Sequence, residues 1–541
     1  MTARIDASLF ADGKPLVFGV FLNGVRFATQ WTTLNRADDA GYSFMLYLEL
    51  DPAAVGSGGS VLRQRASLTC DPVLNPLSYQ SEANGVRIGL DFAADTVHAT
   101  LADGSQRDVP RGGAQLIVEA YIFGLDAIGL AHAALRSPLP DKTTLVAFVA
   151  NSLIALPIEL SAAPDLGTND GGRWFASTQG EQLLIRDDGA LMVSRMTAQG
   201  VEARRELSPP PLPGWRDQAL TAHAANYAPD KGSAIDVKEV DIPGDGPPIG
   251  GTLSRPTQPG PFPSALFIGG SGAIDRNGIS GELDVGTHEI MDQLAAAGVL
   301  GLRFDARGAG RTPIGHEGLE PSLAGKAADA RAALAFLRQQ PDCDRDRVFL
   351  IGHSQGGLVA MHVAADDPAL RGLALLATPG RPIDEVMLEQ GEHQAERLNL
   401  PPESRETSRQ QLREFASLVR ARATFEAGKV PDLMLSGTPY LHWMREHLDN
   451  PGVDLIRRLR CPVLICQGDK DRMVSVDRDA RALESAARSA GVSARLEILG
   501  GLDHHFKSVG AGESTPALDF DPSRRVDRRL IDLLASWLRA R

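Results

Sequence analysis

Apolar runs of strand length recur through the second half of the chain and alternate with segments of helical period. The runs lie at 264–272, 299–308, 347–357, 371–380, 461–471 and 494–505. Helical periodicity fills most of the intervals, at Glu289–Ala297, Leu323–Arg338 and Arg478–Ala490. This alternation predicts an α/β fold, and the continuous apolar runs predict a mostly parallel, doubly wound sheet with both faces covered by helices.

One charged segment of helical pattern, about 381–455, interrupts this alternation between two of the predicted strands. An insertion at that place predicts a helical cap over the sheet. Its stretch 432–448 is rich in large apolar side chains, which predict either the lining of an apolar pocket or the core of the cap. These side chains are Met434, Leu435, Tyr440, Leu441, Trp443 and Met444.

The first part of the chain has a different pattern, with short apolar or alternating stretches separated by Gly, Asp, Asn and Pro. Examples are "GVRIGLDF", "TVHATLADG" and "QLLIRDDGALMVSRM", the last with a hairpin-type turn at 187–189. This pattern predicts a β-rich domain of antiparallel strands. Two stretches, 126–137 and 143–156, are interpreted as helices, the second of them buried.

Four prolines within residues 209–213 separate the two patterns, because proline continues neither a helix nor a central strand. The sequence therefore predicts a β-rich accessory domain at 1–207, a Pro-rich linker at 208–234 and an α/β domain at 235–541 that contains the cap insertion at about 381–455.

The amino-acid composition argues against several classes of binding partner and cofactor. The 541 residues are 43% hydrophobic and 23% charged, with a net charge of −13 and a pI near 5.5. The acidic balance argues against a nucleic-acid or anionic-membrane partner. The four cysteines have neither a disulfide pattern nor zinc-ligand spacing, and we expect no metal and no cofactor. Without a signal-peptide or membrane-spanning pattern, the expectation is a cytoplasmic protein, although a trimmed chain would look the same. A homo-oligomer stays open.

A Gly-x-Ser-x-Gly pentapeptide, Gly352 to Gly356, carries the candidate chemistry. It closes an apolar strand and opens a helical pattern, which is the strand–turn–helix context of a nucleophile elbow. Ser354 is then the candidate nucleophile, and its hydroxyl needs a neighbouring base and a third group that orients that base. Both groups are expected at the carboxyl ends of later strands, in the chain order Ser, Asp, His. Two carboxylates, Asp469 and Asp471, and two imidazoles, His504 and His505, follow such strands.

These motifs resemble those of α/β-hydrolase serine esterases on the dienelactone-hydrolase and prolyl-oligopeptidase-like branch, and the resemblance covers about residues 235–541. "PVLICQGDKDRMV" is similar to the acid loop of these enzymes and "GLDHHF" to their histidine turn. By their position in these loops, the resemblance favours Asp471 over Asp469 and His504 over His505. Asp503 stands where the family often has Asn, and a carboxylate there is expected to raise the pKa of the base.

The same resemblance extends to "FIGGSGAIDRNG" (267–278), which is similar to the oxyanion-side loop of these esterases. An oxyanion hole needs two backbone N–H groups. Gln355, directly after the nucleophile, is expected to supply one, and Ser271 or Gly272 the other. A structural ion pair between Asp305 and Arg307 is expected beneath the site.

The sequence thus predicts a serine hydrolase that cleaves carboxylic esters of small to medium apolar substrates through an acyl-serine intermediate. Two alternatives stay open. One is a thioesterase, amidase or peptidase of the same fold. The other, from a different class, is a lipid- or polymer-binding protein in which the N-terminal domain does the work.

Overall fold

The computed structural model describes residue 10 and residues 14–541 apart from short segments. These segments are 56–60, 84–85, 102–105, 120–121, 137–139, 151–152, 168–171, 178–180, 188, 197–200, 219, 221–226, 228, 230–233, 245, 273, 281, 314–321, 398–399, 422–437, 513, 516–517, 519–520 and 522. The contacts divide the chain into two compact units. The first contains the residues up to His223 and most of helix α7 (Pro402–Arg420), and the second contains Ala224–His393 and Thr438–Arg541.

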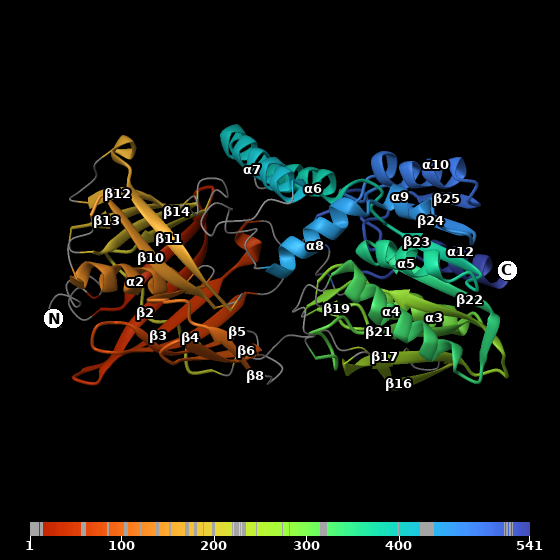
Figure 1. Ribbon diagram of the computed structural model, residues 1–541, viewed down its shortest axis with the longest axis horizontal. Helices are drawn as coiled ribbons and strands as arrows, with labels where there is room; N and C mark the ends of the chain where they lie inside the picture. Colours follow the sequence, from red (N-terminus) through yellow and green to blue (C-terminus); the bar gives the residue numbers. More distant parts are fainter. Residues whose placement is uncertain are drawn as a thin grey trace. The chain divides into compact units, whose positions relative to one another are not determined.

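The first unit is built on a sheet of fifteen strands, with the helix α2 (Phe123–Arg136) packed against it. Its strands are β1 (Leu16–Leu22), β2 (Val25–Asp38), β3 (Gly41–Leu50), β4 (Leu62–Cys70), β5 (Pro76–Ala83), β6 (Val86–Phe92), β7 (Thr96–Thr100), β8 (Gln106–Pro110), β9 (Leu116–Val118), β10 (Lys142–Val149), β11 (Ile154–Ala162), β12 (Gly172–Ser177), β13 (Glu181–Arg186), β14 (Leu191–Met196) and β15 (Val201–Arg205). Two antiparallel meanders, β1–β8 and β10–β15, join where β1 pairs with β15, and β9 adds a parallel edge strand beside β10 (Figure 1).

This sheet curls around its helix. β8, at one edge, contacts β11 near the other edge, and α2 places Phe123, Leu125 and Ile128 in the same core as the strands. The β-rich character and the helix at 126–137 are therefore confirmed. The predicted helix at 143–156 is wrong: this stretch forms the hairpin of β10 and β11. Its run of apolar residues suits a buried helix and a buried strand equally well, and pairing with neighbouring strands decides the outcome.

The second unit contains a sheet of eight strands in the order β16-β17-β21-β18-β22-β23-β24-β25. The strands are β16 (Ile235–Gly244), β17 (Gly246–Pro256), β18 (Phe262–Ile268), β21 (Leu300–Phe304), β22 (Cys343–His353), β23 (Gly372–Leu376), β24 (Val463–Gly468) and β25 (Ala494–Leu499), with a small hairpin of β19 (Ile279–Ser280) and β20 (Leu283–Asp284) beside them. The six predicted strands and the mostly parallel order are confirmed. The antiparallel hairpin β16–β17 was not among the predictions.

Helices cover both faces of this sheet (Figure 1). They are α3 (Thr287–Ala296), α4 (Leu323–Arg338), α5 (Gln355–Asp366), α9 (Gly452–Ile456), α10 (Arg481–Ser489) and α12 (Arg528–Arg539). Two further helices, α6 (Ile383–Arg397) and α8 (Thr438–Asp449), belong to the predicted cap between β23 and β24. Successive side chains of each strand enter two different cores, as the period of two requires. In β22, for example, Val348 and Leu350 pack with α4 and α5, whereas Phe349 and Ile351 pack with α3 and α12. The central strands β18 and β23 are thus fully buried, whereas the edge strands β16 and β25 are partly exposed.

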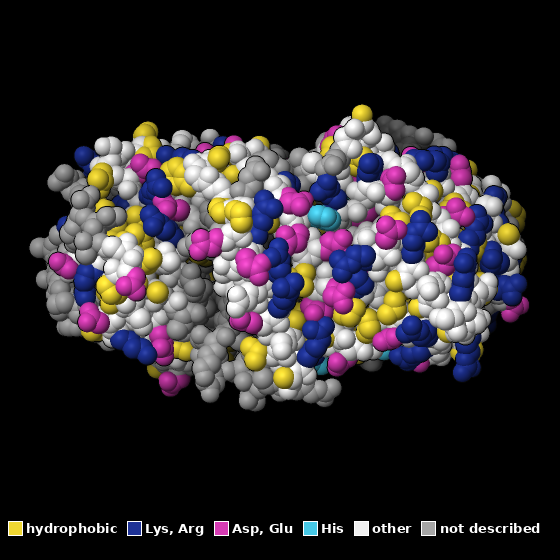
Figure 2. Space-filling model, turned by 90° about the horizontal axis from the view of Figure 1, so that it is seen from above, with side chains coloured by type: hydrophobic (Ala, Val, Ile, Leu, Met, Phe, Trp, Pro, Cys, Tyr) yellow, Lys and Arg dark blue, Asp and Glu magenta, His cyan; other side chains and the backbone are white. Residues whose placement is uncertain are grey.

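Charged side chains of both signs are interspersed over the face that Figure 2 shows. On the helix surfaces, residues of opposite charge form ion pairs one helical turn apart. Arg488 pairs with Glu484, and Arg528 with Asp532, each at 2.8 Å. Such exposed pairs contribute little stability individually, and they keep the helix faces solvated. Among the helices that the structure describes, none has the length and hydropathy needed to cross a membrane.

Candidate active site

Ser354 occupies the turn between β22 and α5 in a strained backbone conformation. Its φ of 54° and ψ of −126° lie in a region that non-glycine residues rarely adopt. The Ser354 amide donates to the carbonyl of Leu376 at 2.8 Å, which fixes the turn to the neighbouring strand β23. The strand–turn–helix context that the sequence predicts for this serine is therefore present.

Two glycines of the motif are required by the close approach of other backbone. A Cβ at Gly352 would lie 2.5 Å from the carbonyl oxygen of Gly356. A Cβ at Gly356 would lie 2.2 Å from the carbonyl oxygen of Ile268, at the end of β18. Both distances are far below van der Waals contact, so only glycine allows α5 to begin this close to the ends of β22 and β18.

Asp471 lies in the loop after β24, which we call the acid loop (residues 469–475), and its side chain is fully buried. One carboxylate oxygen, Oδ1, accepts the amides of Met473 at 2.7 Å and Val474 at 3.0 Å. The other, Oδ2, accepts Gln467 Nε2 at 2.7 Å and His504 Nδ1 at 2.8 Å. Four donors therefore hold this carboxylate in one orientation. Gln467 is a member of the site that the sequence analysis did not identify, because nothing marks a strand glutamine as functional.

The rival residues have other contacts. Asp469 accepts the amide of Gly501 at 2.6 Å, which closes the turn between the loops after β24 and β25. His505 is buried, and burial lowers its pKa well below the ordinary value, with a further contribution from His504. Asp503, which the sequence analysis expected to act on the base, forms a buried ion pair with Arg524 and accepts the amides of His505 and Lys507. It organises the histidine turn.

His353 connects the nucleophile turn to the histidine turn. Its Nε2 donates to the carbonyl oxygen of His504 at 2.9 Å, and the two imidazole rings lie 4.9 Å apart. Burial lowers the pKa of His353 to about 4, with the charge of His504 as the next cause. His353 is therefore neutral near pH 7, and its hydrogen bond holds the backbone of His504 beside the turn that carries Ser354.

The oxyanion-side loop follows β18 and passes beside the nucleophile. A Cβ at Gly270 would lie 3.3 Å from Cβ of Ser354, so this glycine, which the sequence analysis did not single out, lies against it. Ser271 is exposed, and Gly272 has a φ of 88°, a left-handed conformation that favours glycine. Farther along the loop, the buried guanidinium of Arg276 donates to Asp305 at 2.6 Å. Asp305 therefore pairs with Arg276.

The expected ion pair between Asp305 and Arg307 is wrong. Arg307 instead pairs with Asp329 of α4, at 2.6 Å. The reason is that Asp305 turns toward the oxyanion-side loop and is already occupied there by the Arg276 guanidinium and by the amides of Arg276 and Arg311.

Gln355 begins helix α5, where the first amides have no carbonyl partner within the helix. Its buried side chain is held from two sides: its amide Nε2 contacts His447 Nε2 at 2.8 Å, and its Oε1 accepts Lys326 Nζ at 2.7 Å. His447 lies on α8, within the predicted cap, and burial lowers its pKa to about 4. Neutral His447 donates from Nδ1 to the carbonyl of Trp443, which leaves Nε2 as the acceptor for Gln355.

A pocket of about 210 Å³ lies between α6 and the acid loop. It is lined by Glu389, His393, Asp469, Asp471, Arg472, Met473, Ser475, Val476 and Asp477. Of the apolar cap residues in the sequence prediction, Trp443 and Met444 are buried. Met434 and Leu435, and the side chains of Tyr440 and Leu441, lie outside the described residues.

The strand order, the elbow at Ser354 and the Asp471–His504 pair at the carboxyl edge of the sheet define the fold of an α/β hydrolase. The family model described as "Serine aminopeptidase, S33" matches residues 281–506, which span the elbow, the acid loop and the histidine turn. The C-terminal part of the chain therefore has the fold of the α/β hydrolases and is similar to this family in sequence.

The relatives in sequence include proteins named as an esterase and as an uncharacterized peptidase. The chain is 28% identical over 317 residues to esterase EstD of Thermotoga maritima, which covers 57% of this chain and 69% of the relative. It is 23% identical over 293 residues to the uncharacterized peptidase YtmA of Bacillus subtilis, over 54% of this chain and 89% of the relative. A solved esterase of Pyrococcus furiosus aligns with a TM-score of 0.37 at 13% identity, over 58% of this chain and 94% of its own.

Proposed function

We propose that the C-terminal unit is a serine esterase in which Ser354 is the nucleophile, His504 the general base and Asp471 the group that orients it. The observation that carries this proposal is the pair of Asp471 and His504, joined at 2.8 Å. The backbone of His504 is hydrogen-bonded to His353, which directly precedes the serine strained into an elbow. His504 removes the hydroxyl proton as Ser354 attacks the ester carbonyl, and the imidazolium is stabilised by the buried carboxylate.

The tetrahedral intermediate places its negative oxygen near the start of α5. The Gln355 amide and an amide of the loop 270–272, from Ser271 or Gly272, are the proposed donors to that oxygen. The intermediate collapses with loss of the alcohol, which takes its proton from His504, and leaves an acyl-serine. Water then attacks the acyl group with His504 again as base, and the acid is released.

We propose carboxylic esters of small to medium apolar substrates as the substrate class. The test is hydrolysis of 4-nitrophenyl esters from acetate to palmitate by the wild type and by Ser354→Ala. A loss of at least about a thousandfold in the variant is expected for a nucleophile knockout. A wild type inert on every ester, or a variant that keeps its rate, would overturn the proposal.

A peptidase is the second candidate, because the matching family model is described as a serine aminopeptidase and one relative is named as a peptidase. Assays of the wild type and Ser354→Ala on aminoacyl 4-nitroanilides distinguish the esterase from the peptidase. The esterase proposal predicts that esters of matched acyl groups are preferred in kcat/KM, and a preference for the anilides would favour the peptidase.

A further inference from the structure

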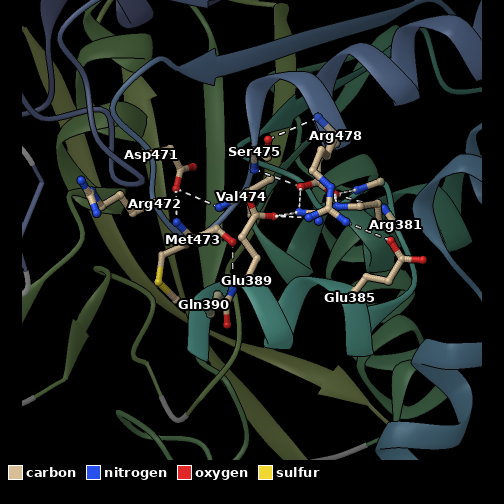
Figure 3. Close-up of polar contacts among 12 residues, drawn as sticks. Arg381, Glu385, Glu389, Gln390, Asp471, Arg472, Met473, Val474, Ser475 and Arg478 are labelled. Atoms are coloured by element: carbon tan, nitrogen blue, oxygen red, sulfur yellow. Dashed lines mark hydrogen bonds and ion pairs between the residues drawn. The ribbon is translucent and has the colours of Figure 1, made fainter. Parts of the chain in front are cut away.

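Helix α6, the first helix of the predicted cap, holds the acid loop by two carbonyl groups. His393 Nδ1 donates to the carbonyl oxygen of Arg472 at 2.8 Å, and Gln390 Nε2 donates to that of Met473 at 3.0 Å. Figure 3 shows Gln390 reaching Met473 from α6, next to Asp471. The two donors are one helical turn apart, so both face the loop from the same side of α6.

The held residues are those that fix the carboxylate of Asp471. Met473 is bound at both ends of its backbone: its carbonyl accepts from Gln390, and its amide donates to Asp471 Oδ1 at 2.7 Å. The next amide, of Val474, donates to the same oxygen at 3.0 Å. A shift of this strip of backbone therefore moves Asp471 relative to the imidazole of His504.

A second connection anchors the start of α6 to the end of the same loop. The buried carboxylate of Asp479 accepts the amides of Gly380 at 3.0 Å and Arg381 at 3.1 Å on one side, and the amide of Ser475 at 2.9 Å on the other. The Arg381 guanidinium adds a bond of 2.7 Å to Asp479. Because its amino end is fixed to the loop, α6 presents Gln390 and His393 at a defined position.

We propose that Gln390 and His393 are positioning residues of the hydrolase: by holding the acid loop, they orient Asp471 toward His504. This inference rests on the proposed function, because it assigns Asp471 and His504 their roles. It makes the cap helix α6 part of the machinery that tunes the base, in addition to any part in covering the site. Neither residue touches the reacting atoms in this account.

The pH profile provides a readout that a purely structural role would not move. The groups around the His504 imidazole are Asp471, His353 and His505. Both neighbouring histidines have lowered pKa values, so His504 is the group expected to titrate in the acid limb of kcat/KM. A well-placed carboxylate raises the pKa of an imidazole, and a loosened one raises it less.

The experiment compares four full-length variants with the wild type on a 4-nitrophenyl ester. Gln390→Leu and His393→Phe, combined, remove both donors and keep the side-chain size. His393→Asn retains a donor near the position of Nδ1. Gln394→Leu, at an exposed position of the same helix, is the matched control. Ser354→Ala reports separately on the nucleophile.

The double variant is expected to lose about tenfold in kcat with KM unchanged, since a small misplacement of a catalytic group is costly. Its acid limb is expected to move to lower pH, because a loosened carboxylate raises the pKa of the base less. His393→Asn and Gln394→Leu are expected to stay near the wild type. Two results would overturn the inference: a double variant with the wild-type acid limb, or a change in KM alone, which would make these residues substrate contacts.

Failure of the proposed function would look different. In that case Ser354→Ala keeps the wild-type rate, or the wild type is inert, whatever the α6 variants do. Thermal unfolding of each variant, followed by circular dichroism, establishes that the compared proteins are folded at the assay temperature. A folded double variant with normal kcat contradicts the inference even when Ser354→Ala is inactive.

Discussion

Replacing Asp471 by Asn is the substitution for which the structure supplies the clearest magnitude. The carboxylate accepts four hydrogen bonds, two at each oxygen. An asparagine has one acceptor oxygen, so its NH₂ group must face either the two backbone amides or the pair formed by Gln467 and His504. In the proposed mechanism, it also removes the negative charge that would stabilise the imidazolium of His504 in the transition state.

The loss can be worked from that charge. Two unit charges about 4 Å apart at an effective dielectric constant of about 20 interact by about 4 kcal/mol. At about 1.4 kcal/mol per factor of ten, this corresponds to a fall of roughly a thousandfold in kcat. Asparagine can also stabilise the wrong tautomer of the imidazole, as the same Asp-to-Asn substitution does in serine proteases with a Ser-His-Asp triad. This second effect brings the expected fall in kcat toward about ten-thousandfold.

The assay is steady-state hydrolysis of a short-chain 4-nitrophenyl ester, with Asp469→Asn as the matched control two residues away. Asp469 bonds the amide of Gly501 and has no described contact with His504 among the residues in the structure. Its variant is expected to stay within about threefold of the wild type, as for a surface change of modest energy. If Asp469→Asn abolishes activity while Asp471→Asn retains it, the assignment of the acid is refuted.

Three further predictions concern the turn, the base and the buried histidines. Gly356→Ala is expected to give an inactive, destabilised protein, because its Cβ would lie 2.2 Å from the carbonyl oxygen of Ile268. Gly269→Ala, with open space around its Cβ, is expected to fold. Thermal unfolding compares the two variants, and equal melting temperatures would contradict the packing argument. His504→Gln is expected to abolish ester hydrolysis and His505→Gln to retain it, with the reverse outcome assigning the base to His505. His353 and His447 have folded pKa values of about 4, below the unfolded value of about 6.5, so the unfolded state binds more protons between these limits. The contribution of these groups to the free energy of unfolding should therefore be fully present above about pH 6.5 and be lost as the pH drops toward 4. His447→Gln should show a shallower loss. The midpoints of urea unfolding across this pH range measure the effect, and a midpoint independent of pH in the wild type would contradict the prediction.

The sequence was sufficient for much of the catalytic half, because local signals and the global fold agree there. The glycines around Ser354 permit its sharp turn, and the parallel strands contain apolar runs, with β18 and β23 buried along their whole length. Helix α4 was predicted at Leu323–Arg338, the bounds that the structure shows. The choice of Asp471 and His504 came from the resemblance to known esterases, and their catalytic roles stay a prediction; in the structure the two side chains are hydrogen-bonded.

Other features depend on contacts between residues far apart in the chain. The stretch 143–156 forms a hairpin because neighbouring strands pair with it, which an isolated apolar run does not reveal. Arg307 pairs with Asp329 of helix α4. Gln355 contacts His447 of the predicted cap, which is 92 residues later in the chain. Gln390 and His393 lack any motif, since their importance lies in two backbone carbonyls of another loop. The role of the N-terminal unit stays a prediction.

The central claim is that Ser354 is a nucleophile, and covalent trapping tests it most directly. The wild type is incubated with a fluorophosphonate, which forms a stable adduct with an activated serine hydroxyl, and peptide mass spectrometry locates the adduct. The account predicts one modified peptide, with the adduct on Ser354, complete loss of labelling in Ser354→Ala and greatly slowed labelling in His504→Gln. An unlabelled Ser354 in active protein, or an adduct on a different residue, would contradict it.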